Sequence, residues 1–518
     1  MRSLERPLLL QRVRNFLKAK RDIEPVEKSV YATVFILICI IGSFAISQLL
    51  LIHNSIRLDE AQSLWQTSHS AAGTLKVVAQ DVHVPLYHMI LHFWQIVVGP
   101  SIESARFLSF LFFVLTIPFV FLLARKVLSV DWSLFVVFLF SFSPFMNWYA
   151  NEARMYTLLV LVATISHFYF MNLIESKGKK GWLGYTLSAM VGVYTHYIFI
   201  FSLLAQGIYF LYKRKAFIAG TLRKFIGLAI LLIVELTPWF LYFRSLGSAS
   251  NTSPNLPLPS TVDFFNVYSQ FSFGFQNDSA NTLIASTWPL LVIVSFLSVK
   301  YGHRLDKKMG YMLIAAFLPV LLVFGLSYVV TPFFLGRYLS AGVVPLTIIV
   351  VWFISHYQKK VSLAASTLMV GLVIFFSLQQ YFSGSTPVKE DFHAAASYLD
   401  SHAKAHDVVI LSAPFSVYPL EYYYNGEAAI RTLPIWNRSI PGPIPAFEPA
   451  KLESEVNTLK ANHQYAYVLF SFDQGYQEQI FQYYERHFER VSSKQFSPNV
   501  ELYVYRVGYD EVKPISQL

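Results

Sequence analysis

The chain has 518 residues, of which 54% are hydrophobic and only 14% are charged, and its mean hydropathy of +0.45 excludes an ordinary soluble globular protein. A net charge of +10 can indicate a nucleic-acid partner, but here the Lys and Arg residues fall between apolar runs, so we expect membrane lipids and no nucleic acid. The single cysteine, Cys39, excludes a disulfide within the chain.

The chain begins with a polar, basic stretch that precedes the first apolar run by nearly thirty residues. A cleavable signal peptide has a much shorter charged start, so we expect the first span to be retained. Residues 1–29 are therefore predicted to be a cytoplasmic N-terminal segment.

About 20 apolar residues are needed to cross a bilayer as a helix. Runs of this kind predict about eleven spans, at 30–52, 104–124, 132–150, 155–174, 182–196, 198–212, 225–244, 282–299, 311–330, 338–356 and 361–382. The apolar run from Val84 to Val98 is shorter, at about 15 residues, and contains His88, His92 and Gln95. We therefore predict that this run is a re-entrant or interfacial helix.

The position of the basic clusters predicts which loops face the cytoplasm. With about eleven spans, the N-terminus and every later basic cluster lie on one side, at Arg125-Lys126, Lys177–Lys180, Lys213–Lys224, Lys300–Lys308 and Lys359-Lys360. Counting Val84–Val98 as a span would place those five later clusters outside. The preferred topology is a multi-pass protein of the plasma membrane with a cytoplasmic N-terminus and an external loop at 53–103.

The composition changes near Pro387 to that of a soluble domain, which the topology places outside the cell. Helices are predicted at 391–405 and 477–490, and strands at 408–412, 465–470 and 500–507. Residues 387–518 are therefore predicted to form a small extracytoplasmic α/β domain after a membrane domain at 30–386.

Acidic residues cluster in the external loop. Asp59 and Glu60 follow the first span closely, and Asp81 and His83 precede the predicted interfacial helix. Asp59 could simply be the N-cap of a helix with Glu60 in its first turn, and Asp81 could be only a helix-start residue. Both clusters are tied to the membrane surface, however, where partial desolvation would suit a general base. A carboxylate near a histidine could also hold a divalent cation, although the spacing matches no standard ligand motif, so no metal is assigned.

Further polar residues are predicted at the same outer level. Glu152 and Arg154 lie in a tight turn between two spans, and Arg337 follows another span. Arginines on the outer side run against the positive-inside trend, and a lipid phosphate is a natural partner for them. His196 lies in another outer turn, where it could line a cavity or be merely solvated. Glu235 interrupts a span, where a functional role and a structural pair are equally consistent with the sequence.

With these residues in view, the chain resembles the GT-C glycosyltransferases, and in particular bacterial proteins similar to protein O-mannosyltransferases and lipid A aminoarabinose transferases. The stretches that carry the resemblance are Leu58–Ala61, Asp81–Tyr87, Ser143–Phe145, Asn151–Tyr156, Thr195–Tyr197 and Gly336–Leu339. The similarity is densest across 50–212. Each motif is weak alone, but their order and their common side of the membrane are fairly specific.

The resemblance implies a GT-C fold and an extracytoplasmic active site. It implies that Asp59, with Glu60 beside it, is the catalytic base that deprotonates an acceptor hydroxyl. The implied donor is a polyprenyl phosphate carrying a mannose-like hexose or a pentose, with its phosphate against Arg154 or Arg337. Asp81, His83, Glu152 and His196 are then candidates for binding substrate or a divalent cation. The acceptor could be a lipid, a glycan or a protein, because no acceptor-recognition module is identified in 388–518.

Two other functions are consistent with the sequence. A transporter or flippase of lipid-linked sugars would also bind polyprenyl phosphate, but transporters usually show repeated halves and polar sites at the midplane. A non-catalytic surface protein could use the C-terminal domain to bind a partner. The concentration of polar residues at one face favours an inverting glycosyltransferase.

Overall fold

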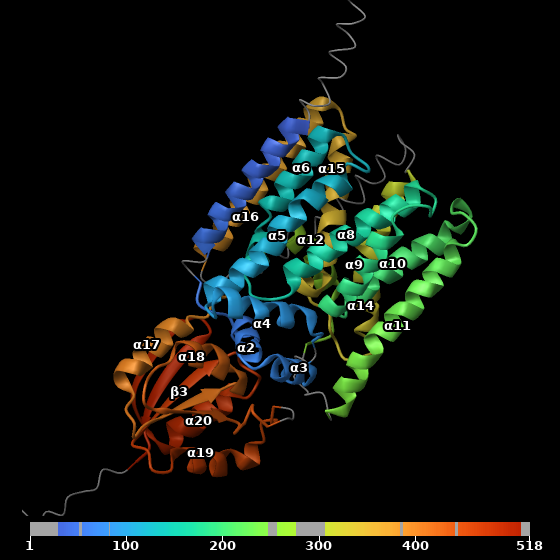
Figure 1. The fold of residues 1–518 in the computed structure, drawn as a ribbon. Helices are drawn as coiled ribbons and strands as arrows, with labels where there is room; N and C mark the ends of the chain where they lie inside the picture. The colour runs from blue at the N-terminus through green and yellow to red at the C-terminus, as the bar shows by residue number, and fades with distance from the viewer. Residues whose placement is uncertain are drawn as a thin grey trace, which may run out of the picture.

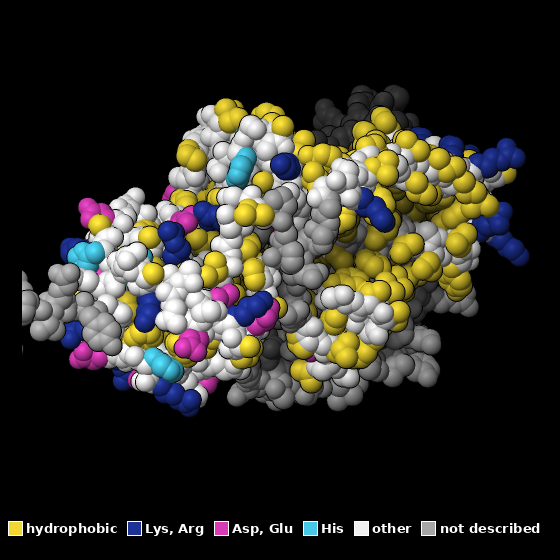
Figure 2. Space-filling model, turned by 90° about the horizontal axis from the view of Figure 1, so that it is seen from below, with side chains coloured by type: hydrophobic (Ala, Val, Ile, Leu, Met, Phe, Trp, Pro, Cys, Tyr) yellow, Lys and Arg dark blue, Asp and Glu magenta, His cyan; other side chains and the backbone are white. Residues whose placement is uncertain are grey.

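The computed structural model describes residues 29–50, 54–81, 83–246, 256–275, 306–383, 387–440 and 444–508. The chain folds into two parts (Figure 1). A bundle of long helices extends to α16, and a smaller domain with a β-sheet follows it. Apolar side chains cover much of the helical part, whereas the C-terminal domain has a mixed charged and polar surface (Figure 2).

The helical part contains long apolar helices of the length that a bilayer requires. Among the described residues seven qualify: Ser29–Leu50, α5 (Ile102–Ala124), α8 (Tyr156–Glu175), α11 (Thr221–Ser245), α14 (Lys307–Leu326), Gly336–Ser355 and α16 (Lys359–Phe382). The segment Gly336–Ser355 joins the short 3-10 helix η2 (Gly336–Gly342) to α15 (Val343–Ser355). The protein is therefore a multi-pass membrane protein, as the sequence predicted.

The predicted number of about eleven spans is not confirmed. The predicted span 132–150 is a bent pair, α6 (Val130–Ser141) and α7 (Pro144–Ala150), which meet at 55° and would bring the total to eight. The bend lies where Pro144 starts a new helix, since proline cannot continue the hydrogen-bond ladder of the helix before it.

Two further predicted spans, 182–196 and 198–212, are short for a bilayer crossing in the structure, as they are in the sequence. The helices α9 (Trp182–Thr195) and α10 (Phe199–Tyr212) have 14 residues each, which is only about 21 Å of helix. The predicted span 282–299 lies outside the described residues.

Short helices occupy the segment between the first two spans. They are α2 (Leu58–Thr67), α3 (Ala71–Ala79) and α4 (Leu86–Val98), and they lie between the bundle and the C-terminal domain (Figure 1). Another short helix, α12 (Thr261–Phe273), packs inside the bundle against α7. The interfacial position of α4 stays a prediction. Phe93, Ile96, Val97 and Val98 leave its outer face apolar and exposed.

The C-terminal domain has one sheet with the strand order β2-β1-β3-β5-β4. The strands are β1 (Val408–Ser412), β2 (Ala429–Leu433), β3 (Tyr465–Ser471), β4 (Glu489–Ser497) and β5 (Val500–Arg506), and the helices are α17 (Phe392–His402), α18 (Val417–Tyr423), α19 (Leu452–Lys460) and α20 (Gln477–His487). The strands β2, β1 and β3 are parallel, whereas β5 runs antiparallel to β3 and β4. The predicted small α/β domain is confirmed, although β2, β4, α18 and α19 were not predicted.

Candidate active site

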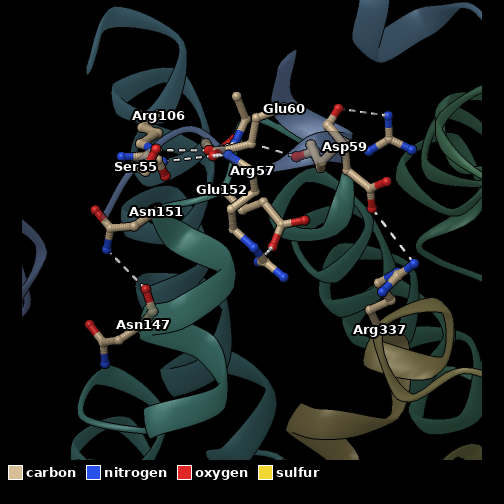
Figure 3. A network of polar contacts seen from close by, with 12 residues as sticks. Ser55, Arg57, Asp59, Glu60, Arg106, Asn147, Asn151, Glu152 and Arg337 are labelled. Carbon is tan, nitrogen blue, oxygen red and sulfur yellow. Dashed lines mark hydrogen bonds and ion pairs between the residues drawn. The ribbon is translucent and has the colours of Figure 1, made fainter. Parts of the chain in front are cut away.

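Asp59 and Glu60 are consecutive residues in the first turn of α2, and their side chains point in opposite directions (Figure 3). The interpretation of Asp59 as a helix N-cap is wrong, because α2 begins at Leu58 and its N-cap is Arg57. Asp59 is therefore inside the helix, where its carboxylate is available for interactions with other elements.

The carboxylate of Asp59 faces Arg337, which comes from η2. The distance from Asp59 Oδ2 to Arg337 Nη2 is 3.6 Å, and each side chain remains 29% exposed. Burial raises the pKa of Asp59, but the nearby charges of Arg337 and Arg154 outweigh it and lower the pKa to about 2. Asp59 is thus an ionised carboxylate that substrate can reach.

Glu60 has a different environment. Its carboxylate accepts hydrogen bonds from Arg106 Nε at 2.8 Å and Arg106 Nη2 at 2.7 Å, and from the backbone N–H groups of Ala153 at 2.9 Å and Arg57 at 3.0 Å. Glu60 is completely buried, and Arg106 is 3% exposed. These four donors leave the carboxylate little capacity to bind substrate. The geometry favours Glu60 as a residue that joins α2, α5 and the turn at Ala153.

Arg154 lies beside Asp59. Its Nη1 donates to Ser63 Oγ at 3.0 Å and to the carbonyl of Asp59 at 3.3 Å, and its Nη2 contacts His83 Nε2 at 2.8 Å. A guanidinium can only donate, so His83 Nε2 must be the acceptor and the imidazole is neutral. Burial and then the Arg154 charge lower the pKa of His83, in agreement with this assignment.

Both arginines retain unused hydrogen-bonding capacity. The buried Nε atoms of Arg154 and Arg337 have no hydrogen-bond partner within the described part of the chain. Buried donors are normally paired, so these two N–H groups have the capacity to bind a ligand. Two guanidinium groups beside one carboxylate form a site suited to an anion.

The other acidic candidates lie around this centre. Asp81 Oδ2 accepts from the side-chain amides of Gln62 at 3.0 Å and Gln66 at 2.8 Å, and it is 3.7 Å from His83 Nε2. Asp81 therefore connects the segment after α3 to α2.

Glu152 forms an ion pair with Arg57, whose guanidinium lies 4.6 Å from the centre of the Trp148 ring. Glu152 is 1% exposed, and burial raises its pKa in spite of the Arg57 charge. The pair places Arg57 beside the carboxylates of the site (Figure 3).

His196 borders the site on the side of α9 and α10. Its ring centre is 5.1 Å from that of Tyr338, and its Nδ1 accepts from the N–H of Ile198 at 3.2 Å. Burial and then Arg154 lower the pKa of His196 to about 3, so the ring is neutral. His83 and His196 also line a pocket of about 360 Å³ whose wall continues along Ile200, Phe201 and Phe333.

Most of the predicted site residues therefore converge, although they come from segments far apart in the sequence. Glu235 does not join them, because it lies in α11, where its backbone carbonyl accepts a hydrogen bond from the hydroxyl of Tyr194.

Sequence reasoning missed Arg57, Arg106, Ser63 and Glu390. Arg106 left a usable signal, since an arginine near the start of an apolar span needs a partner. Glu390 left none, because it follows the last span by several residues and reaches the site only through the fold.

The possible divalent cation stays an untested prediction. Among the described residues there is no group of three or more His, Cys, Asp or Glu side chains that could hold a metal ion. Nε2 of His83, one of its candidate ligands, is already occupied by Arg154.

Part of the chain matches a known protein family. Residues 82–242 match the family model described as dolichyl-phosphate-mannose-protein mannosyltransferase. A search of the curated proteins by sequence found no match.

Solved structures give the fold. The chain is similar to ArnT from Cupriavidus metallidurans in the apo state, with a TM-score of 0.60, 10% identity, and coverage of 91% of this chain and 98% of ArnT. The structure of the same protein bound to undecaprenyl phosphate matches with a TM-score of 0.60 and 11% identity, and the match covers 93% of this chain and 98% of ArnT. The archaeal oligosaccharyltransferase AglB from Archaeoglobus fulgidus has a TM-score of 0.46 and 9% identity, and the match covers 85% of this chain and 69% of AglB. The fold is that of ArnT, and the predicted resemblance to GT-C membrane glycosyltransferases is confirmed.

Proposed function

We propose that this chain, which has the fold of the GT-C membrane glycosyltransferases, transfers a sugar from a polyprenyl-phosphate donor to an acceptor hydroxyl. The observation that carries the proposal is the exposed carboxylate of Asp59 beside two arginines, Arg154 and Arg337, that each keep an unpartnered buried Nε. A reaction that needs a base next to a phosphate leaving group requires this combination.

The donor phosphate would lie between Arg154 and Arg337, and its lipid tail would follow the pocket wall of Ile200, Phe201 and Phe333. The family model describes a dolichyl-phosphate-mannose enzyme, and the similar ArnT structure contains undecaprenyl phosphate. Both descriptions support a polyprenyl phosphate as the lipid part. The sugar would be a mannose-like hexose or a pentose, and the acceptor a lipid, glycan or protein.

In the proposed reaction the acceptor oxygen attacks the anomeric carbon from the side opposite the phosphate, and Asp59 accepts the hydroxyl proton. The new C–O bond forms as the bond to the phosphate oxygen breaks. The electron pair leaves with the phosphate, whose charge the two arginines stabilise. The anomeric configuration is therefore inverted. The two arginines supply the positive charge that these steps require.

The low pKa of Asp59 fits this sequence of events. A carboxylate with a pKa of about 2 is a weak base. A bound phosphate would engage Arg154 and Arg337 and add negative charge, and both effects raise the pKa of Asp59. The donor would thus make the base stronger at the moment when it is needed.

We place this reaction at the outer face of the plasma membrane, with the N-terminus in the cytoplasm. The support is the positive-inside distribution of Lys and Arg. The exposed apolar side chains of α4 add to it, since they suit a site at the level of the lipid headgroups.

Binding of radiolabelled undecaprenyl phosphate to the purified protein in detergent tests the donor site. We expect Arg154→Gln and Arg337→Gln each to weaken binding at least about tenfold, because each removes a charge-assisted contact worth about 1.4 kcal/mol or more. Arg244→Gln, at the end of α11, is the control and should bind like the wild type. Unchanged binding in both site variants would contradict the proposed donor site.

A further inference from the structure

The segment 54–57 leads directly into α2 and is held from the membrane domain on one side. The guanidinium of Arg106 donates to the carbonyl of Asn54 at 3.0 Å and to the carbonyl of Ser55 at 2.9 Å. The same side chain binds Glu60 on α2. Arg106 therefore fixes the carbonyl groups of this segment relative to the first turn that carries Asp59.

Two further polar groups of the segment, the N–H of Ile56 and the hydroxyl of Ser55, contact the C-terminal domain. The hydroxyl of Tyr423, at the end of α18, accepts a hydrogen bond from the N–H of Ile56 at 2.9 Å. The N–H of His393 donates to Ser55 Oγ at 3.3 Å, and the rings of His393 and Tyr423 pack edge to face at 5.0 Å. Residues of α17 and α18 in the C-terminal domain thus hydrogen-bond to the chain just before Asp59.

The position of Ile56 makes the tyrosine contact important. Ile56 is completely buried, so water cannot replace the tyrosine as a partner for its N–H. It lies three residues before Asp59, at the point where the backbone turns into α2. If its N–H lost Tyr423, its one partner among the described residues, the segment would have to shift to find another, and α2 would shift with it.

We propose that the C-terminal domain takes part in the reaction by positioning Asp59, and that Tyr423 is the positioning residue. The role of Asp59 in the reaction rests on the proposed function. The positioning of Asp59 by Tyr423 does not. The domain is then required for transfer even if it never contacts the acceptor. Its closeness to the site is also evident from Glu390, whose charge interacts with those of Arg57 and Asp59.

The chain contains its own controls, because three consecutive tyrosines make three different contacts. Tyr422 accepts from the N–H of Ile102 at the start of α5, at 3.0 Å, and so also joins the two domains. Tyr424 donates to the carbonyl of Ala428 within the C-terminal domain, at 3.1 Å. Replacing each by phenylalanine removes one hydroxyl and keeps the ring. Only Tyr423→Phe removes the hydrogen-bond partner of the Ile56 N–H.

The test uses the full-length protein and has one readout that does not depend on activity. Hydrogen–deuterium exchange of peptides covering Ile56 should be about tenfold faster in Tyr423→Phe, the equivalent of one lost hydrogen bond. Tyr422→Phe and Tyr424→Phe should exchange like the wild type there. Equal exchange in all three variants would overturn the proposal, whatever the enzyme transfers.

The second readout is release of polyprenyl phosphate from a polyprenyl-phosphate sugar. Tyr423→Phe should lower kcat about tenfold and leave the KM for the donor unchanged, because Arg154 and Arg337 are untouched. A donor KM that rises with unchanged kcat would contradict a positioning role. If wild type releases no polyprenyl phosphate, the proposed function fails while the exchange result still decides the positioning of Asp59 by Tyr423.

Should Tyr423→Phe not yield folded protein, Ser55→Ala provides the second variant. It removes the contact with His393 from the membrane-domain side and leaves the C-terminal domain intact. We expect faster exchange at Ile56 and a smaller loss of kcat, of about threefold. Wild-type values for both would overturn the proposal.

Discussion

The neighbouring residues Asp59 and Glu60 show how the same acidic chemistry can have two roles. Glu60 is completely buried and accepts four hydrogen bonds, whereas Asp59 is partly exposed and faces Arg337 at 3.6 Å. Sequence reasoning placed both in the site but could not separate them, because the difference depends on Arg106 and Arg337, which lie far away in the sequence. The sequence predicted that both residues lie in one external loop near the membrane surface, but not the direction of each side chain.

The low pKa of Asp59 gives a prediction for the pH dependence of the reaction. Removal of the Arg337 charge should raise the pKa of Asp59, because a nearby cation favours the ionised carboxylate. As the pH falls, the base is lost when the pH passes this pKa. The acid limb of kcat, which reports the donor-bound enzyme in which the pKa of Asp59 is raised, should therefore lie at higher pH in Arg337→Gln than in wild type, as measured between about pH 4 and 8. An acid limb at the same pH in both proteins would contradict the assignment of Asp59 as the base.

At the scale of elements, α2 is held in place by a buried ion pair in addition to the hydrogen bond from its N-cap N–H to Glu60. The pair of Glu60 and Arg106 joins α2 to α5, and both side chains are almost completely buried. The sequence predicted short helices in this loop but not their partners. The arginine that secures them belongs to the next span.

The buried ion pair predicts a large effect on stability. Glu60→Gln should lower the free energy of unfolding by about 3–5 kcal/mol, because the buried charge of Arg106 would lose its partner. Glu175→Gln is the matched control, since Glu175 pairs with Lys126 and Lys308 at the surface and should contribute less than about 1 kcal/mol. Thermal unfolding in detergent compares the two. Equal shifts in Tm would show that the Glu60 pair is not important for stability.

The number of membrane crossings shows where reasoning from apolar runs fails. Length and composition identified the long spans, but a run such as 132–150 is a single apolar stretch in the sequence and two helices at 55° in the structure. The hydropathy of this run does not reveal that a new helix begins at Pro144. The short helices α9 and α10, by contrast, match the predicted runs 182–196 and 198–212 closely.

The sidedness of the chain can be tested with single cysteines in a Cys39→Ser background. We expect Asn425→Cys in the C-terminal domain to react with an impermeant thiol reagent added to intact cells, and Lys179→Cys in a basic loop to stay unlabelled until the membrane is opened. Both residues are exposed, so access to the reagent and not burial decides the result. Labelling of Lys179→Cys in intact cells would overturn the orientation.

At the scale of the whole molecule, the candidate active site lies where the helical bundle meets the C-terminal domain. The sequence predicted a separate α/β domain, including β1, β3 and β5, because their apolar runs are bounded by turn residues. It did not predict β4, which is exposed along most of its length, or the contacts of Tyr422 and Tyr423. Docking between domains depends on a few polar atoms that leave no periodic signal in a sequence.

The central claim is that Asp59 is the base of a glycosyl transfer, and release of polyprenyl phosphate from a polyprenyl-phosphate sugar in the presence of a membrane extract tests it most directly. We predict that Asp59→Asn lowers the rate of release at least about 100-fold, the usual scale for loss of a general base, while binding of undecaprenyl phosphate persists. Glu103→Gln, which removes an exposed carboxylate from the first turn of α5, should release at the wild-type rate. Wild-type release by Asp59→Asn would contradict the account.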